Sequence, residues 1–542
     1  MLYICFMNKR ILKQLLSYFL VFGIGYFLTG MILSSFKKKA VVVSNNSGIF
    51  NVKNDLWEER QLSNASQYSM DYQLLGDTAA TNKKVIFTDD YASENGVFCF
   101  RGNPQRNSPS RGVLNKRPTH LKVMWVFETE QDNRTTKYGT WGGGTGWTGQ
   151  PLLVNWPQKT KEQLAAITPA FRNKKDAIEV IVGSLCGKVY FLDFLTGKIT
   201  RPALSINNPI KGTVSVDPRM NGLLYVGQGI PNGVRFGSYV FDMFSGKEIF
   251  YRSGLDKSAH RKWGAFDSNP LIDPKTGYWF QPAENGQIYK TKVTNKSQIS
   301  NTVTFNYTTP KDSKIGIESS FAAWNNLGFF GDNSGNVFCI DLISMKPMWS
   351  INNYDDTDAS MVIDVENKQP FLYIANEVDK QGAKGTAYIR KINALTGKEV
   401  WSHAKTCYGS KLAGKTNSGG VLATILTGKK QANKLVYGIY SRMDKKNRGE
   451  FVAINKETGK VQFSILMDNY SWASPIDLYD KNGNCYVFFT DVSGTIYLID
   501  GVSGKLIIKQ KMDAIWESSP VAWGNKIILG SRGNKIFGFE LF

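Results

Sequence analysis

The sequence contains little histidine, few helix-period stretches and no paired cysteines. Its three histidines among 542 residues argue against a histidine-rich metal site. None of the six cysteines belongs to a C-x-x-C pair, so zinc-ribbon and thioredoxin-type chemistry have no support, and buried free thiols are the simpler expectation. We find no Ser-His-Asp arrangement and no P-loop, which argues against two common classes of enzyme.

One glycine-rich stretch, WGGGTGWTGQPLLV from Trp141 to Val154, matches the G-x-G-x-x-G spacing of a dinucleotide-binding turn. That motif binds a pyrophosphate only where a helix follows it. Here a short apolar run follows, ended by Pro157, and this indicates a strand. We therefore interpret the glycines as a sharp turn into that strand.

The first forty residues differ from the rest of the chain. An uncharged run of about nineteen residues, Leu15 to Leu33, has basic residues on both sides. At 1.5 Å per residue this run just spans a hydrocarbon core of about 30 Å. It is long for a cleaved signal peptide and no small-residue cleavage site follows it. We therefore predict a cytoplasmic tail at residues 1–14 and an uncleaved transmembrane anchor at residues 15–36; the charges alone do not orient it.

A repeat organises the remainder, which is rich in glycine and in short runs of Val, Ile, Phe and Tyr. Each copy has an alternating apolar strand, then Asp or Asn, two variable residues, Thr or Ser, usually Gly-Lys, and a second strand. The acidic or amide side chain can bond the backbone two residues on, and Gly supplies a positive φ. The turn residues are Asp193, Asp242, Asp341, Asn393, Asn455 and Asp500. Their spacing of about fifty residues, with a degenerate copy at Gly286, predicts an all-β propeller with four strands per blade.

Eight short segments that open with small residues precede these hairpins. They begin at Thr148, Lys211, Asp267, Glu318, Asp358, Asn417, Ala473 and Glu517. Innermost strands crowd around a propeller axis, where small residues fit, so the segments predict eight blades. The final unit, Gly533 to Phe542, lacks an outer strand, and residues 121–129 form an outer strand with no blade before it. Since Trp125 matches Trp349 and Trp401 in other units, we predict that residues 121–129 complete the eighth blade and close the ring.

The pattern G-x-[VI]-[YF]-x-[LI]-[DN]-x-x-[TS]-G-K-x-x-W, with FRGNPQRNSPSRG from Phe100 ahead of the ring, resembles the pyrroloquinoline-quinone (PQQ)-like β-propeller repeat family. The resemblance covers residues 98–542, after a tether at residues 37–97. It places the chain in the quinoprotein alcohol dehydrogenase-like superfamily, which also contains non-enzymatic BamB-like members, and the chain is closer to these in character. By resemblance, a dehydrogenase would carry an adjacent Cys-Cys pair, a calcium set and a docking Trp in most blades. The chain has no Cys-Cys pair, so PQQ with calcium is disfavoured and we expect no cofactor.

In such rings the loops ahead of the inner strands and those between the second and third strands share one face. Carboxylates and indoles from several blades are therefore expected at the mouth of the channel. These candidate ligand-binding residues are Trp147, Trp263, Asp267, Glu318, Asp358, Trp472, Trp516 and Glu517. They can hold a cation, stack a sugar or support acid–base chemistry. The alternatives are local hydrogen bonds to the following amides and packing at blade junctions. We assign no catalytic and no metal-ligating residue.

Two long hairpin loops carry a predicted basic rim. It comprises Lys380, Lys384, Arg442, Lys445, Lys446 and Arg448. An anionic partner is one interpretation of this rim and of the net charge of +21, and solvated loop tips and general solubility are the other. An acidic glycan or an envelope protein would suit the first interpretation. Nucleic acid is not expected, because the anchor is predicted to place the ring outside the cytoplasm.

We predict a single-pass inner-membrane protein whose propeller, in the periplasm or outside the cell, is a binding or scaffolding module for envelope protein or glycan. The alternative is an enzyme at the channel mouth, either polysaccharide-active or a divergent quinoprotein. An enzyme needs its carboxylates close together, so four carboxylates more than about 10 Å apart would exclude it. A scaffold is instead expected to show satisfied carboxylates with ordinary pKa values.

Overall fold

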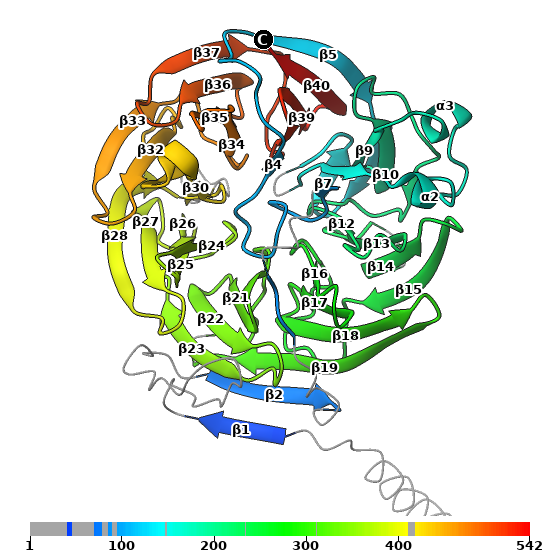
Figure 1. Ribbon diagram of the computed structural model, residues 1–542. Helices are drawn as coiled ribbons and strands as arrows, with labels where there is room; N and C mark the ends of the chain where they lie inside the picture. The colour runs from blue at the N-terminus through cyan, green and yellow to red at the C-terminus, as the bar shows by residue number, and fades with distance from the viewer. Residues whose placement is uncertain are drawn as a thin grey trace, which may run out of the picture.

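The computed structural model describes residues 41–45, 70–77, 85–88, 95–146, 149–232, 235–310, 312–409 and 418–542. In this part of the chain, eight sheets of four antiparallel strands each, some with added strands, radiate from a central axis (Figure 1). The all-β, eight-bladed propeller is therefore confirmed. The predicted anchor at residues 15–36 lies outside the described residues. Within them, we find no helix that is both long and apolar enough to cross a membrane.

The blades are numbered along the chain, and each runs from the axis outwards. Blade 1 has β8 (Leu152–Asn155), β9 (Ile178–Gly183), β10 (Lys188–Asp193) and β11 (Leu204–Ser205). Blade 2 has β12 (Ser215–Val216), β13 (Leu223–Gly227), β14 (Gly237–Asp242) and β15 (Lys247–Ser253). Blade 3 has β16 (Leu271–Ile272), β17 (Tyr278–Pro282), β18 (Gln287–Asn295) and β19 (Gln298–Thr308). Blade 4 has β20 (Ala322–Trp324), β21 (Leu327–Gly331), β22 (Asn336–Asp341) and β23 (Pro347–Asn352).

The second half of the ring repeats this order. Blade 5 has β24 (Val362–Glu366), β25 (Gln369–Ala375), β27 (Lys384–Asn393) and β28 (Glu399–Tyr408). Blade 6 has β30 (Leu426–Thr427), β31 (Leu435–Tyr440), β32 (Glu450–Asn455) and β33 (Val461–Leu466). Blade 7 has β34 (Ile476–Tyr479), β35 (Cys485–Thr490), β36 (Thr495–Asp500) and β37 (Leu506–Lys511). Blade 8 has β38 (Val521–Trp523), β39 (Lys526–Gly530), β40 (Lys535–Leu541) and, as its outer strand, β5 (Leu121–Glu128).

The ring closes as the sequence predicts. Strand β5 pairs antiparallel with β40, from Leu121 opposite Leu541 to Glu128 opposite Lys535. The outer strand of the last blade therefore comes from a part of the chain that precedes the first blade. In Figure 1, β5 in cyan lies beside the red β40 at the C-terminus.

Further elements decorate the ring. They are β1 (Val41–Asn45), β2 (Met70–Gly76), β3 (Gly96–Val97), β4 (Ser110–Arg111), β6 (Asp132–Thr136), β7 (Gly139–Gly142), β26 (Glu377–Val378), β29 (Gly419–Gly420), the helices α2 (Gln158–Lys161) and α3 (Pro169–Arg172), and the 3-10 turn η4 (Lys430–Ala432). Strand β2 pairs with β19, and β1 pairs with β2, so the region predicted as a tether adds two strands to the outside of blade 3 (Figure 1).

Tryptophans join neighbouring blades at the hairpin between the third and fourth strands. Trp125, Trp349 and Trp401 each donate the indole N–H, at 2.8–3.0 Å, to a carbonyl in the hairpin of the next blade. Each acceptor is the residue after the turn Asp or Asn. The turn glycine lies under the ring: at Gly397, with φ of 68°, an added Cβ would come 2.9 Å from Trp349. The Gly of the repeat is thus required by the turn and by the tryptophan.

Other side chains serve the same acceptor at two further junctions. The Tyr437 hydroxyl donates to the carbonyl of Gly501 at 2.8 Å. Lys290 donates to the carbonyls of Leu342 and Ile343, both at 2.8 Å, and burial lowers the pKa of this lysine to about 7. The repeat pattern, which ends in Trp on the fourth strand, does not identify these two junctions. Their donors are a Tyr on a second strand and a Lys on a third strand.

A belt of hydroxyls joins the inner strands around the channel. From blade 3 to blade 8, the backbone N–H of one residue donates to the Ser or Thr hydroxyl at the same position of the next blade, at 2.8–3.1 Å. These bonds run Asn269 to Ser320, Ser320 to Ser360, Ser360 to Thr424, Thr424 to Ser474 and Ser474 to Ser519. Gln150 donates likewise to Thr213 between blades 1 and 2. The small residues at the starts of the inner strands therefore do more than fit a narrow space, since they cross-link the ring.

Residues 96–114, which we call the axial segment, cross the centre of the ring (Figure 1). They bond to all eight inner strands or to one of the two residues before them. Strand β3 pairs with blade 1 and β4 with blade 8. The remaining backbone and side-chain bonds involve Phe98 with Val216, Phe100 with Asn269, Pro104 with Ala323, Gln105 with Ile363, and Arg101 with Ile425 and Pro475. The inner edges of the blades, which would otherwise lack partners, are thereby satisfied.

Candidate functional site

The antiparallel order of each blade brings two sets of loops to one face. The start of an inner strand and the turn between the second and third strands lie at the same end of the sheet. Asp267, Glu318 and Asp358 stand before inner strands of blades 3, 4 and 5, whereas Glu284 and Glu377 stand in the second set of loops. These loops bring the carboxylates together at one end of the ring, which we call the mouth.

The first group at the mouth consists of Asp267, Glu284 and Glu318. One carboxylate oxygen of each lies within 4.8 Å of the others. Lys211, from the start of blade 2, forms an ion pair with Asp267 and lies 4.0 Å from Oε1 of Glu284. Arg261 lies 3.9 Å from the other oxygen of Glu284. Two cations thus face three carboxylates, and Glu284, only 2% exposed, accepts no hydrogen bond at Oε1 from the described residues.

Two glycines make room for this group. A Cβ on Gly229, in a blade 2 loop, would come 2.5 Å from the Lys211 side chain and 2.6 Å from Oδ1 of Asp267. A Cβ on Gly316, ahead of blade 4, would come 1.7 Å from the Arg261 guanidinium. Any larger residue at either position would therefore displace one of the cations.

The second group consists of Asp356, Asp358 and Glu377. Its nearest cation is Lys380, whose Nζ lies 4.0 Å from Asp356 and whose side chain is half exposed. Asp358 and Glu377 are 8% and 2% exposed. Glu318 interacts electrostatically with Asp356 and Asp358, so it links the second group to the first. Together the six carboxylates face three cations, and we call this cluster the acidic half of the mouth.

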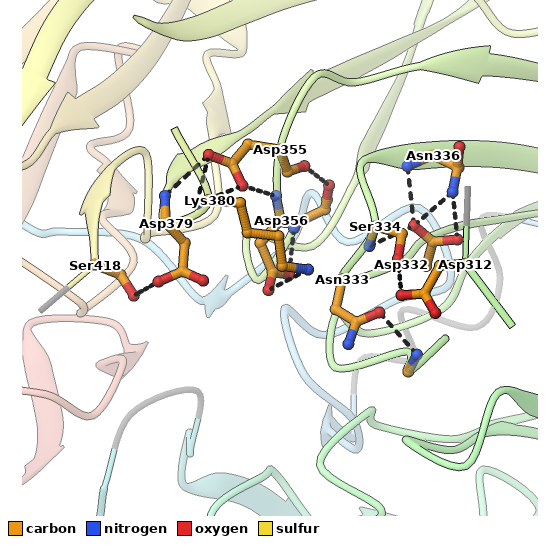
Figure 2. Close-up of polar contacts among 12 residues, drawn as sticks. Asp312, Asp332, Asn333, Ser334, Asn336, Asp355, Asp356, Asp379, Lys380 and Ser418 are labelled. Atoms are coloured by element: carbon orange, nitrogen blue, oxygen red, sulfur yellow. Dashed lines mark hydrogen bonds and ion pairs between the residues drawn. The ribbon is translucent and has the colours of Figure 1, made fainter. Parts of the chain in front are cut away.

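Figure 2 shows how the loops that carry the second group are held. The Asp355 carboxylate accepts the backbone N–H groups of Asp379 and Lys380 at 2.9–3.1 Å, which fixes the turn after Glu377. In blade 4, Asn333 accepts the N–H of Gly316 at 2.9 Å and so holds the segment that leads to Glu318. The carboxylates are therefore presented by braced loops.

Burial and mutual repulsion perturb the acidic half. Burial, reinforced by the charge of Glu318, raises the pKa of Asp358 to about 7. The same causes raise the pKa of Glu284 well above its ordinary value. Burial and then the charge of Asp358 raise the pKa values of Asp356 and Glu377. Burial alone would lower the pKa of Lys211, but Asp267, Glu284 and Glu318 outweigh it and keep the ammonium charged.

In the opposite half of the mouth, formed by blades 6–8, the charged side chains have different partners. Glu517 is paired with Arg532 at 2.8 Å. Arg442 is buried, donates to the carbonyl of Ser418 and stacks on Tyr470 at 4.0 Å. Of the predicted carboxylates, Asp267, Glu318 and Asp358 thus come together, whereas Glu517 belongs to a separate ion pair.

The predicted tryptophans have different roles. Trp263, half buried, packs against Tyr138 of the β6–β7 hairpin and against Phe236, with ring centroids 5.0 and 5.5 Å apart. Trp516 is fully buried and packs against Phe537 and Phe539 in blade 8, so it contributes to the core. Trp472 is half buried. Trp147 lies outside the described residues.

Two of the six side chains of the predicted basic rim have a carboxylate nearby, and one is buried. Arg448 pairs with Asp444 at 2.6 Å, Lys380 lies against Asp356, and Arg442 is a buried stacking residue instead of a surface charge. Lys384, Lys445 and Lys446 are exposed. The predicted rim therefore consists of three exposed lysines and three basic side chains that are held by other contacts.

Sequence reasoning missed Glu284, Asp356 and Glu377. Glu284 and Glu377 lie in loops between second and third strands, where the repeat has no fixed residue. A signal was present: both follow a buried strand by two residues, at the end of the blade that also holds the start of the inner strand. Lys211 occupies the same repeat position as Asp267, but only the structure shows that its side chain turns towards that carboxylate.

The described cysteines do not form the adjacent pair that the family resemblance implies for PQQ. By family resemblance the quinone would lie on an adjacent cysteine pair, but the described cysteines are single free thiols in different blades and in the axial segment. They are Cys99, Cys186, Cys339, Cys407 and Cys485. We derive no chemical step through this cofactor.

No protein-family model matches the chain, and no curated protein matches its sequence. Among solved structures, BamB from Moraxella catarrhalis is similar with a TM-score of 0.48 and 14% identity, over 78% of this chain and 100% of that one. A europium-containing methanol dehydrogenase (TM-score 0.44, 12% identity, 83% and 99% covered) and the computationally designed Ika8 protein (0.44, 12%, 67% and 93%) are also similar. The eight-bladed topology itself is established by strand pairing within this chain.

Proposed function

We propose that this protein is a membrane-anchored, extracytoplasmic binding or scaffolding propeller that takes up a cationic group at the acidic half of its mouth. One observation carries the proposal: six largely buried carboxylates from three blades face only three cations. Uncompensated buried negative charge is costly, and it is relieved by protons or by a bound cation. An envelope protein or glycan that presents a positive group is the expected partner.

The perturbed carboxylates depart from what a passive scaffold requires. A scaffold that uses only its outer surface has no need of an Asp whose pKa is raised to about 7. The same observation supports a second candidate, an enzyme that uses this carboxyl as a general acid or base. The close approach of Asp267 and Glu318 is compatible with it. We place binding first because the excess of negative charge is shared by all six carboxylates, as a binding site for a cation requires. An enzyme would instead need a substrate placed beside one particular carboxyl.

Thermal unfolding of the full-length chain in detergent tests the proposal. Calcium chloride, spermidine and a lysine-rich peptide are each compared with sodium chloride at equal ionic strength. A cation held at a hundred times its dissociation constant stabilises the folded state by about 2.7 kcal/mol. At least one cation is expected to raise the melting temperature of the wild type and to lose this effect in a Glu318→Gln, Asp358→Asn double variant. If none does so beyond sodium chloride, the proposal is wrong.

A further inference from the structure

The first group of carboxylates has the composition and spacing of a site for a hard divalent cation. Asp267, Glu284 and Glu318 offer only oxygen atoms, which calcium, magnesium and manganese prefer. Two oxygens bound to one Ca²⁺ at 2.3–2.6 Å lie at most about 4.6–5.2 Å apart, whereas Mg²⁺ allows only about 4.2 Å. The three oxygens lie within 4.8 Å of one another, so their common centre is at most about 2.8 Å from each, and a movement of a few tenths of an ångström brings all three to Ca²⁺ distance.

A second observation shows that the existing cations do not complete the group. Oε1 of Glu284 is buried, and it accepts no hydrogen bond within the described part of the chain. The nearest ammonium, on Lys211, is 4.0 Å away because it is drawn to Asp267, and the Arg261 guanidinium stays 3.9 Å from the other oxygen. A buried carboxylate oxygen without a donor costs free energy, so a ligand that reaches it is favoured.

We propose that Asp267, Glu284 and Glu318 bind a divalent cation of the calcium class, and that the ammonium of Lys211 is a built-in competitor for it. The proposal rests on the proposed function and names the ligand of that site. Lys211 supplies one positive charge where the ion would supply two. To bind, the ion must replace the ammonium of Lys211 as the partner of Asp267. Breaking this ion pair lowers the affinity of the three carboxylates for the ion.

The competition gives the proposal a test that a merely structural ion-pair network would fail. Calorimetric titration of Ca²⁺, with Mg²⁺ in parallel, is done on the chelator-treated full-length chain in detergent. The wild type is expected to bind one Ca²⁺ and to bind Mg²⁺ at least tenfold more weakly. Lys211→Met is expected to bind Ca²⁺ at least tenfold more tightly, and Glu284→Gln at least tenfold more weakly. Arg532→Met removes a cation from the same mouth but not from this group, and is expected to change the affinity less than twofold.

Each outcome decides the proposal. Absence of saturable Ca²⁺ binding in both the wild type and Lys211→Met overturns it, as does an unchanged affinity in Glu284→Gln. If Glu284→Gln does not fold, Glu318→Gln replaces it with the same expectation. Should spermidine or the peptide stabilise the mouth while Ca²⁺ does not bind, this inference fails and the proposed function stands. If no cation acts, both fail.

Discussion

On the side of blades 3–5, six carboxylates of the mouth face three cations, whereas on the side of blades 6–8 Glu517 has Arg532 as a close partner. Both halves carry acidic residues at the same repeat position, ahead of the inner strands. In the opposite half the charges of the Glu517–Arg532 pair are matched and partly exposed, so the pair costs little and contributes little stability. In the acidic half they are buried and unmatched, and that arrangement is kept at the expense of stability. The difference is the reason why we propose the acidic half as the binding site.

The largest expected effect follows from removal of the internal counter-charge. Lys211→Met leaves Asp267 buried without its ion-pair partner, which should destabilise the protein by about 3–5 kcal/mol at neutral pH. Denaturant unfolding in the absence of divalent cations measures it. If Lys211→Met costs no more than Arg532→Met, the two halves do not differ as described.

The two halves should also differ in their response to pH. The pKa of Asp358 is about 7 when folded and near its ordinary value of 3.8 when unfolded, so the folded state binds more protons between these values. Stability should therefore fall as pH rises from about 4 to 7, by about 3–4 kcal/mol for this group alone. Melting temperatures from pH 4 to pH 8 measure it. Asp358→Asn should flatten the slope, whereas Arg532→Gln should keep it; a wild-type melting temperature that rises with pH would contradict the argument.

Smaller effects are expected where blades are joined. Trp349→Phe, at the junction of blades 4 and 5, loses the indole donor and leaves the carbonyl of Ala394 unpaired, at a cost of about 2 kcal/mol. Tyr437→Phe, at the junction of blades 6 and 7, removes one hydroxyl and should cost about 1 kcal/mol. Denaturant unfolding compares them, with Trp523→Phe as a control for ring size, because Trp523 is half buried and makes no blade-docking bond in the described part of the chain. Equal costs for all three variants would show that the docking bond contributes nothing.

The smallest effect belongs to the opposite half. Glu517→Gln weakens a partly exposed ion pair with Arg532 and should change stability by less than about 1 kcal/mol. The change should diminish further in 0.5 M salt, which screens exposed charges. A larger or salt-independent loss, measured by the same unfolding assay, would show that Glu517 takes part in a buried network like that of blades 3–5.

The fold was predictable because its causes are local and repeated. The turn residues Asp193 and Asn393 accept the amide hydrogen bonds that their spacing predicts, and eight starts of inner strands gave eight blades. Closure by β5 could be predicted because the last blade lacks an outer strand and β5 has no blade of its own, so pairing the two satisfies both edges. The course of the axial segment could not be predicted, because most of its partners are backbone groups of the inner strands, which place little constraint on residue type.

The site was predictable only in part. Asp267, Glu318 and Asp358 recur at one position of the repeat, so their convergence could be inferred from blade geometry. Glu284 and Glu377 lie in loops of variable length, and their contacts depend on where those loops fold back. The separate pairing of Glu517 depends on Arg532, two residues beyond a strand end, and no periodicity marks it.

The axial segment has a consequence for how the ring is assembled. A chain made from its N-terminus carries residues 96–114 before any blade exists, so each new inner strand has a ready template along the axis. Closure must wait, since Leu121 pairs with Leu541, more than four hundred residues later. The axial segment is thus synthesised first, and the β5–β40 pairing that closes the ring forms last. Until β40 emerges, the edge of β5 stays open to pairing with strands of other chains.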